Sequence, residues 1–351
     1  ERVFHSVLIA DMLDLRQGGT SMRATGIGKA LLLLVGSVLA IALGVSAESE
    51  ARVLLIFSYH AEYAWHAEEA RGVEEVLQRE GVSYEEFYLD TKRQTSDEWK
   101  EQTATRAKEK IEEYDPSLVI VFDDNACELV AKHYVGESLP FVFCGVNADP
   151  AEYGFPATNV TGVLERPDFK GSVELLRVLV PSIEKVALIT DASPSAEGFA
   201  EGLEDLSLPV EITEIYLTND FDDWQAKVLE IQSEVDAIGL FTYHTISRQG
   251  EEESMSPDDV LRWTLENSGL PEFATLDFTV EGGALCGVAL SAYEQGKTAA
   301  EIAVRILAGE KPSDIPVAIP QATRAMVNAA RAAELGIEVS EDTLLGIELI
   351  R

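Results

Sequence analysis

The chain has 351 residues, with 62 acidic and 27 basic side chains, so its net charge at pH 7 is −35. The first 47 residues carry four basic and three acidic side chains, so the remaining 304 hold 23 and 59, a net charge of −36. A surface this acidic repels phosphates, which excludes nucleic acid as a partner; its simplest role is solubility, and we expect a monomer. A length of 304 residues suits two domains.

The N-terminal segment predicts export. Residues 22–47 combine early basic side chains, an apolar stretch and the small residues Val45-Ser46-Ala47, as secretory signal peptides do. We expect cleavage after Ala47 and a periplasmic or extracytoplasmic protein, and residues 1–21 would then be upstream sequence translated by mistake. The alternative is an uncleaved anchor, because the 18-residue apolar run that ends at Ala47 is at the short limit for a membrane span.

The next part of the chain alternates short apolar runs with longer amphipathic stretches. Alternation of strand and helix predicts a parallel sheet with right-handed crossovers. The predicted elements are, in chain order, strand 52–57, helix 67–80, strand 84–89, helix 99–114, strand 118–122, helix 126–132, strand 141–144 and strand 158–163.

The same alternation then occurs a second time. Two α/β lobes of similar size, with strand ends that face each other, would enclose a ligand between them. The elements of the second alternation are helix 169–179, strand 185–190, helix 195–206, strand 212–217, helix 221–235, strand 237–241, helix 257–268 and strand 271–275. The pattern breaks near the end of the chain, into strand 287–291, helix 293–308, extended segments at 317–320 and 325–328, and a helical turn at 329–335.

The strand at 118–122 carries the clearest signal of a binding site. Its five residues are apolar, three of them β-branched, and it runs directly into Asp123-Asp124-Asn125 before a helix. In open α/β sheets this edge is where ligands bind. Asp and Asn are also preferred helix N-caps, but three such residues exceed what one cap needs. The next strand leads into Asn147, so two adjacent strand ends form one rim of a cleft.

Polar and aromatic side chains at the strand ends are the candidate ligand-binding residues. They are Ser58, Tyr59, Tyr63, Trp65, Asp124, Asn125, Asn147, Asp191, Thr242, Tyr243, Asp277 and Glu281. Trp65 and Tyr63 offer flat apolar faces, although simple packing of Trp65 is the alternative. Asp124 or Asp277 would pair with an ammonium group, and hydroxyls such as Ser58 with helix N-termini would hold a carboxylate. This mixture predicts an amino acid or a similar amphipathic solute.

The sequence predicts neither an enzyme nor a cofactor. It contains no nucleophile elbow, phosphate-binding loop or zinc-protease motif. The residues His60, His66 and His244 can converge on zinc or nickel, but solvated loop histidines are commoner, so we expect no metal and no catalytic residue. A hydrolase that pairs Asp123 or Asp124 with His244 is the weaker alternative.

Several segments resemble the substrate-binding proteins of ABC transporters, in the group that includes tryptophan and tyrosine binders. The segments are 159–163, 282–288, 299–303 and 309–317, within a resemblance that spans residues 50–345. The resemblance implies an α/β, two-lobed type I periplasmic binding fold, with two parallel-sheet lobes and a hinge of three crossings. Lobe 1 would hold 50–162 and 286–312, and lobe 2 would hold 163–285 and 313–351.

A second resemblance is to periplasmic sensor domains of bacterial histidine kinases. The segments that carry it are 58–60, 63–65, 90–93, 123–126 and 143–147. Because no kinase sequence follows, we expect an exported protein that captures a small organic solute and delivers it to an ABC permease in the inner membrane. The alternative is a ligand-sensing module that acts on a separate histidine kinase. In both cases the lobes would close on the ligand.

Overall fold

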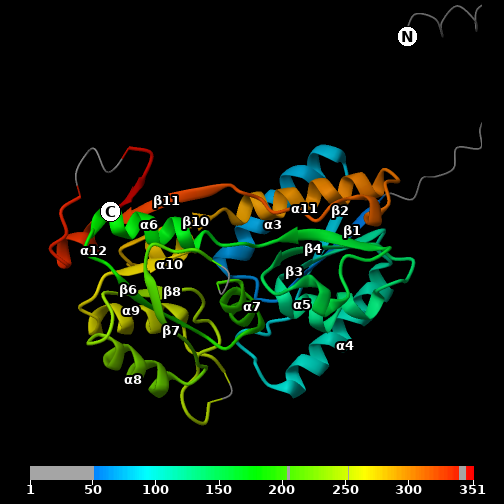
Figure 1. Ribbon diagram of the computed structural model, residues 1–351. Coiled ribbons are helices and arrows are strands. Elements are labelled where there is room, and N and C mark those ends of the chain that lie inside the picture. The colour runs from blue at the N-terminus through cyan, green and yellow to red at the C-terminus, as the bar shows by residue number, and fades with distance from the viewer. Residues whose placement is uncertain (1–50, 204–205, 252, 340–344) are drawn as a thin grey trace, which may run out of the picture. The chain divides into compact units, whose positions relative to one another are not determined.

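A computed structural model of the chain describes residues 51–203, 206–251, 253–339 and 345–351, and two β-sheets organise them (Figure 1). The five-stranded sheet has the order β2-β1-β3-β4-β5, and the seven-stranded sheet has the order β12-β11-β10-β9-β8-β6-β7. We call these sheets, with their covering helices, the first and the second lobe. The predicted signal peptide and residues 1–21 lie outside the described residues. Within those four ranges, no helix is long and apolar enough to cross a membrane.

The first lobe is a fully parallel sheet covered by helices on both faces. Its elements are β1 (Arg52–Phe57), α3 (Ala64–Glu80), β2 (Ser83–Tyr88), α4 (Asp97–Tyr114), β3 (Leu118–Phe122), α5 (Asp123–Leu129), β4 (Phe141–Val146), β5 (Val160–Leu164) and the later α11 (Ala292–Leu307). Side chains alternate along β1, so Leu55 packs with α3 and α11, whereas Ile56 packs with α4 and α5. Covering both faces explains why β1 and β3 are continuous apolar runs.

Helices α3 and α11 lie side by side although they come from opposite ends of the described sequence (Figure 1). A Cβ at Gly72 would lie 2.2 Å from the carbonyl oxygen of Tyr293, and a Cβ at Gly296 would lie 2.0 Å from the carbonyl oxygen of Glu69. Glycine is therefore needed at both positions for this close approach. The contact fixes the segment of α3 that carries the Glu69 side chain.

The second lobe has one antiparallel pair, β10 with β11, in an otherwise parallel sheet. Its elements are α6 (Phe169–Leu179), β6 (Lys185–Thr190), α7 (Pro194–Gly202), β7 (Glu211–Leu217), α8 (Phe221–Ile231), β8 (Ala237–Leu240), α9 (Pro257–Asn267), β9 (Glu272–Ala274), α10 (Asp277–Glu281), β10 (Cys286–Leu290), β11 (Thr323–Asn328), α12 (Ala329–Glu334) and β12 (Glu348–Ile350). The indole of Trp224 in α8 is fully buried and donates a hydrogen bond to Thr264 of α9 (2.9 Å).

All three of the predicted lobe boundaries change in the structure. The strand β10 hydrogen-bonds to β9 and β11, so residues 286–290 belong to the second lobe, and the prediction that placed them in the first lobe is wrong. The chain crosses at Ser291, which caps α11 by accepting a hydrogen bond from the amide of Glu294. The reason is that strand pairing, rather than the helix that follows, decides which lobe holds a strand.

The remaining crossings also lie slightly later than predicted. Strand β5 continues past residue 162 to Leu164, which pairs with Val146 in the first sheet. After α11, Ile315 packs into the first lobe's core and Ala318 pairs with Val163. The third crossing therefore lies beyond residue 318 rather than at 312.

The predicted fold class, two α/β lobes linked by three crossings, is confirmed. The strands β1, β3 and β6 and the helix α6 have the predicted bounds. Two local predictions are wrong. The triplet Asp123-Asp124-Asn125 forms the first turn of α5 instead of preceding the helix, and residues 277–281, expected as a strand tip, form the short helix α10.

Candidate ligand-binding site

Segments that follow strands of both lobes meet around a cavity of about 30 Å³, which we call the interlobe cavity. The lining residues are Tyr59, Tyr63, Trp65, His66, Glu69, Asp123, Gly145, Asn147, Glu165, Ser195, Phe241, Thr242 and Leu276. One water molecule needs about 10–15 Å³, so the cavity has room for about two. Pockets for small organic ligands measure about 300–1,000 Å³, so the lobes are closed around this cavity.

A larger groove of about 390 Å³ adjoins the interlobe cavity and shares Asn147 and Glu165 with it. The groove is lined mainly by α7 and by the first crossing, including Arg166. The cavity differs from it in being lined by Glu69, whose buried Oε2 accepts no hydrogen bond, with His66 Nε2 3.5 Å away. Buried polar atoms normally find partners, so the cavity, rather than the groove, is the candidate site.

Aromatic rings form one wall of the cavity. The rings of Tyr59 and Tyr63 stack with centroids 4.0 Å apart and planes at 11°, and His244 meets Tyr63 edge-on at 4.9 Å. Trp65 comes from the first turn of α3 in the first lobe, yet it belongs to the core of the second lobe together with Phe241. Burial raises the pKa of both tyrosines well above its usual range, so both phenols stay neutral.

Two buried carboxylates, those of Glu69 and Glu165, line the cavity close to Gly145. Gly145 has φ +70°, and a Cβ there would lie 3.1 Å from Oε1 of Glu69 and 3.7 Å from Oε2 of Glu165. Burial raises the pKa of Glu69 well above its usual range, and repulsion from Glu165 and Asp123 adds to the rise. Burial, then repulsion from aspartates, raises the pKa of Glu165 to about 8 although Asn147 donates a hydrogen bond to it.

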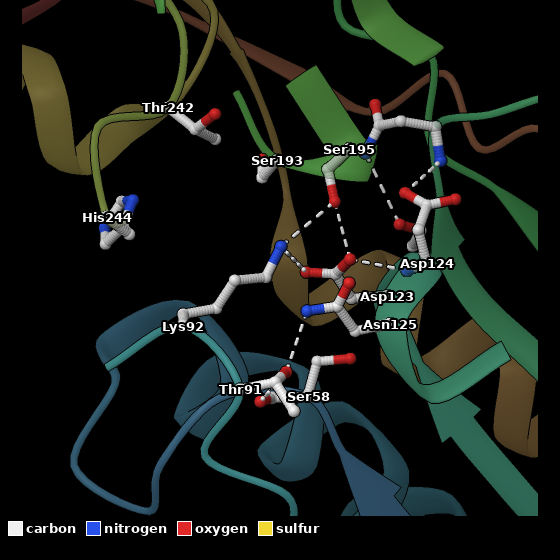
Figure 2. Close-up of polar contacts among 12 residues, drawn as sticks. Ser58, Thr91, Lys92, Asp123, Asp124, Asn125, Ser193, Ser195, Thr242 and His244 are labelled. Carbon is white, nitrogen blue, oxygen red and sulfur yellow. Dashed lines mark hydrogen bonds and ion pairs between the residues drawn. The ribbon is translucent and has the colours of Figure 1, made fainter. Parts of the chain in front are cut away.

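A buried lysine links the two lobes beside the cavity (Figure 2). The Lys92 side chain is 1% exposed; its Nζ lies 3.2 Å from Oδ2 of Asp123 and donates a hydrogen bond to Oγ of Ser195 (3.3 Å). The Ser195 hydroxyl, from α7 of the second lobe, donates to Oδ1 of Asp123 (2.6 Å). Asp123 holds a left-handed φ of 72°, a strained conformation that turns its carboxylate toward these partners.

Five of the residues predicted from the sequence line the cavity: Tyr59, Tyr63, Trp65, Asn147 and Thr242. The others lie outside its lining and have structural contacts.

Three predicted residues of the first lobe hold the strand ends together. The Ser58 hydroxyl donates to the carbonyl of Phe122 and accepts from the amide of Ala126, and the Asn125 amide donates to Thr91 (2.8 Å). Asp124 is fully buried, and its carboxylate accepts hydrogen bonds from Asn147 N, Ala148 N and Tyr153 Oη at 3.0–3.2 Å. Burial raises the pKa of Asp124 to about 6. Its predicted contact with a ligand ammonium is therefore corrected, because internal donors already occupy its oxygens.

The predicted residues of the second lobe are similarly engaged. Asp191 accepts from the amides of His244 and Thr245 and thereby joins the ends of β6 and β8. The Tyr243 hydroxyl lies 3.1 Å from Thr279 Oγ1.

The remaining two predicted carboxylates, of Asp277 and Glu281, lie close to the guanidinium of Arg324. Oδ2 of Asp277 lies 3.2 Å from Arg324, and Oε1 of Glu281 lies 3.6 Å from it. Neither residue lines the interlobe cavity, so the predicted role of Asp277 as the ammonium partner is also corrected.

The candidate list from the sequence omitted the ionisable residues that line or adjoin the cavity, of which only His66 and Asp123 were considered, for a metal site and for a hydrolase: His66, Glu69, Lys92, Asp123 and Glu165. A signal for Glu69 was present, because it follows Trp65 by four residues and so shares its helix face. Glu165 directly follows β5 and is itself a strand tip. Nothing in the local sequence marks Lys92, which reaches the site from a loop.

Comparisons with known proteins agree with this architecture. The family model described as ABC transporter substrate binding protein matches residues 61–346. No curated protein matches the chain by sequence.

Several solved structures share the fold. The chain is similar to an ABC domain in complex with L-Trp from Streptococcus pneumonia, with 20% identity, a TM-score of 0.67, and coverage of 86% of this chain and 100% of that one. It is similar to a conserved domain protein from Vibrio cholerae, with 17% identity, a TM-score of 0.70 and the same coverages. It also resembles a ligand-free, open substrate-binding protein from Clostridium difficile, with 18% identity, a TM-score of 0.62, and coverages of 86% and 99%. With the family match over most of its length, the chain belongs to the ABC transporter substrate-binding protein family.

Proposed function

We propose that this protein is exported, captures a small organic solute between its two lobes, and delivers it to an ABC permease in the inner membrane. The observation that carries the proposal is the interlobe cavity itself, which side chains of both lobes line and in which Glu69 Oε2 and Asn147 Oδ1 lack partners. A solute that donates hydrogen bonds to these atoms would satisfy them. Contacts from both lobes to one solute would also hold the lobes closed.

The lining favours an amphipathic solute, such as an amino acid or a compound like it. Tyr63 and Trp65 provide flat apolar surface, and Glu69 and Glu165 provide negative charge for an ammonium group. These two glutamates replace Asp124 and Asp277 as the ammonium partners. The similar protein from Streptococcus pneumonia, in complex with L-Trp, supports a solute of this kind.

Loading requires the lobes to separate, because the closed cavity of about 30 Å³ admits only water. Between the lobes, Gln94 donates a hydrogen bond to Glu253 (2.8 Å) and Ser254 donates to the carbonyl of Lys92 (2.9 Å). Separation breaks these polar contacts and withdraws the Trp65 indole from the core of the second lobe. The similar protein from Clostridium difficile, solved ligand-free and open, supports such a movement.

Mass spectrometry tests the proposal directly. Protein purified from its native host is denatured, and the released small molecules are identified and then titrated back by calorimetry. We expect one solute with an apolar group and hydrogen-bond donors, and Trp65→Ala should weaken its binding at least tenfold. The matched control is Trp263→Ala in α9, outside the cavity lining. Release of no solute, together with no binding of any candidate amino acid or amine, would refute the proposal.

A further inference from the structure

We propose that the interlobe cavity selects an organic ammonium that carries no carboxylate, such as an aromatic amine, over the corresponding amino acid, and that it exchanges this cation for a proton. The inference rests on the proposed function and narrows its solute class. Three features of the cavity carry it: carboxylates without a lysine or arginine partner, an amide oxygen of Asn147 that accepts no hydrogen bond, and donors that are already engaged.

The first feature is an excess of buried carboxylate beside the cavity. Glu69 and Glu165 both lie within 4 Å of the position that a Cβ of Gly145 would take. The ionisable and polar groups that face these two glutamates from the surrounding elements are His66, Tyr63, Lys92, Asp123, Asp124, Cys144, Asn147 and Arg166. The Nε2 of His66 lies 3.5 Å from Oε2 of Glu69, but burial lowers the pKa of His66 well below its usual range, so His66 brings no positive charge.

The two cations among these groups are committed elsewhere. The Lys92 ammonium pairs with Asp123 and donates to Ser195. The Arg166 guanidinium donates to backbone carbonyls, with Nη1 3.0 Å from Val146 O and from Asn147 O and 2.7 Å from Glu165 O. Neither lysine nor arginine lines the cavity. A cation that enters the cavity therefore meets two carboxylates with no cation of their own.

The second feature is the side-chain oxygen of Asn147, which is buried and accepts no hydrogen bond. Asn147 is only 7% exposed and lines the cavity. Its Nδ2 donates to Glu165 Oε1 (3.2 Å) and to Gly145 O (3.4 Å), while its Oδ1 has no partner. Oε2 of Glu69, from α3, is the other buried carboxylate or amide oxygen of the lining that accepts no hydrogen bond. A buried acceptor without a donor costs free energy, which a ligand that donates to it recovers.

The third feature is that the cavity offers no positively charged partner to the carboxylate of an amino acid. The hydroxyls of Ser195 and Thr242 already donate, to Asp123 (2.6 Å) and to Asp191 (2.9 Å). The N-terminus of α7 faces Asp123, so an anion is in place at that positive helix end. The neutral hydroxyls of the tyrosines are the donors that remain. Hydrogen bonds from them do not offset the free energy of burying an amino acid's carboxylate beside aspartates and glutamates.

The proton exchange follows from the same geometry. Two carboxylates this close in a buried site do not both ionise unless a cation joins them. Burial, and then repulsion from Asp123 and Asp124, raises the pKa of Glu165 to about 8, so Glu165 holds a proton at pH 7 when no solute is bound. An organic ammonium stabilises the ionised carboxylate, and the displaced proton passes to the solvent. Binding at pH 7 therefore releases close to one proton, and the affinity rises as the pH rises toward 8.

Calorimetry with matched pairs tests this inference. Tyramine is compared with L-tyrosine, and tryptamine with L-tryptophan, at pH 7 in phosphate and in Tris, two buffers with different heats of ionisation. We expect at least one amine to bind at least tenfold more tightly than its amino acid. Its binding enthalpies in the two buffers should differ by about the difference between the heats of ionisation of Tris and phosphate, as the release of one proton requires. Glu165→Gln should remove this buffer dependence and weaken amine binding at least tenfold.

The control is Glu68→Gln, an exposed glutamate next to Glu69 on α3, which should keep both properties. Tighter binding of the amino acids, or amine binding with equal enthalpies in the two buffers, would overturn the inference and leave the proposed function intact. The same holds if neither class binds while another solute is released from the purified protein. If no solute is released and none binds, the proposed function fails as well.

Discussion

Gly198 of α7 in the second lobe lies against Ala148 of the first lobe, and a Cβ at Gly198 would come within 2.4 Å of the Cα of Ala148. The atoms that it would meet are backbone atoms, which cannot rotate away as a side chain can. The closed arrangement of the lobes therefore depends on the absence of a side chain at this position, although Gly198 takes no part in the core of either lobe.

We predict that Gly198→Ala opposes closure. Alanine raises the helix propensity of α7 by about 1 kcal/mol, so the second lobe should not lose stability. Small-angle scattering of the solute-loaded protein should show a larger radius of gyration than for the wild type, and affinity for the solute should fall. Gly202→Ala is the matched control, because it lies in the same helix with nothing within 4 Å of its Cβ position. If the two variants scatter alike, Gly198 does not limit closure.

Lys92→Met should destabilise the protein strongly. The substitution leaves Asp123 without its buried cation, and breaking a buried ion pair costs about 3–5 kcal/mol. Urea unfolding of the solute-free protein measures the change. The comparison is Lys132→Met, which breaks the more exposed pair with Glu128 and should cost about 0–1 kcal/mol. Equal losses in the two variants would show that the buried pair adds no stability.

Stability should fall as the pH rises, and Glu165 should account for part of that fall. A glutamate has a pKa of about 4.3 in the unfolded chain, whereas burial raises the pKa of Glu165 to about 8 in the folded protein. Between these values the folded state holds the extra proton, so this stabilisation is complete below pH 4.3 and is lost through pH 8. As the pH rises, the free energy of unfolding of Glu165→Gln should fall less steeply than that of the wild type. The two slopes should differ by up to about 1.4 kcal/mol per pH unit.

Urea unfolding of both proteins between pH 5 and pH 9 checks this expectation, with no solute present. Glu152→Gln, at an exposed position, should reproduce the wild-type profile. Parallel profiles for the wild type and Glu165→Gln would contradict the assignment of the raised pKa to Glu165.

Trp65 should report solute binding by its fluorescence. Its indole lines the cavity, comes from the first lobe and packs in the second, so its surroundings change when the lobes close on a solute. Trp65→Phe should remove most of the solute-dependent change in emission, whereas Trp263→Phe, in α9 away from the cavity lining, should retain it. An unchanged signal in Trp65→Phe would place the responsive indole elsewhere.

Except for β12, the strands and their order of appearance could be predicted from the sequence alone. Strands covered on both faces are apolar at nearly every position, so β1 and β3 can be recognised in the sequence as uninterrupted apolar runs such as Leu118–Phe122. The carboxyl ends of the strands also pointed to the interlobe cavity, which five of the twelve candidate residues line. Alternation of strand and helix is a local property, and it was sufficient to predict two parallel-sheet lobes.

Which side chain of the site faces the ligand was decided only by the tertiary structure. Asp123 and Asp124 are neighbours of the same type, yet Asp123 turns to Lys92 while donors around Asn147 surround Asp124. No local pattern separates them, because their partners come from distant parts of the chain.

The same reason applies to the lobe boundary and to the acidic wall of the cavity. Strand β10 joins the second lobe because β11, which follows the whole of α11, pairs with it. Glu69 and Glu165 come from α3 and the first crossing and meet only around Gly145. The sequence by itself determined the elements, since apolar periodicity and turn residues act over a few positions. The folded chain decided the charge balance of the site, since electrostatic energies depend on distances between residues that the sequence does not place together.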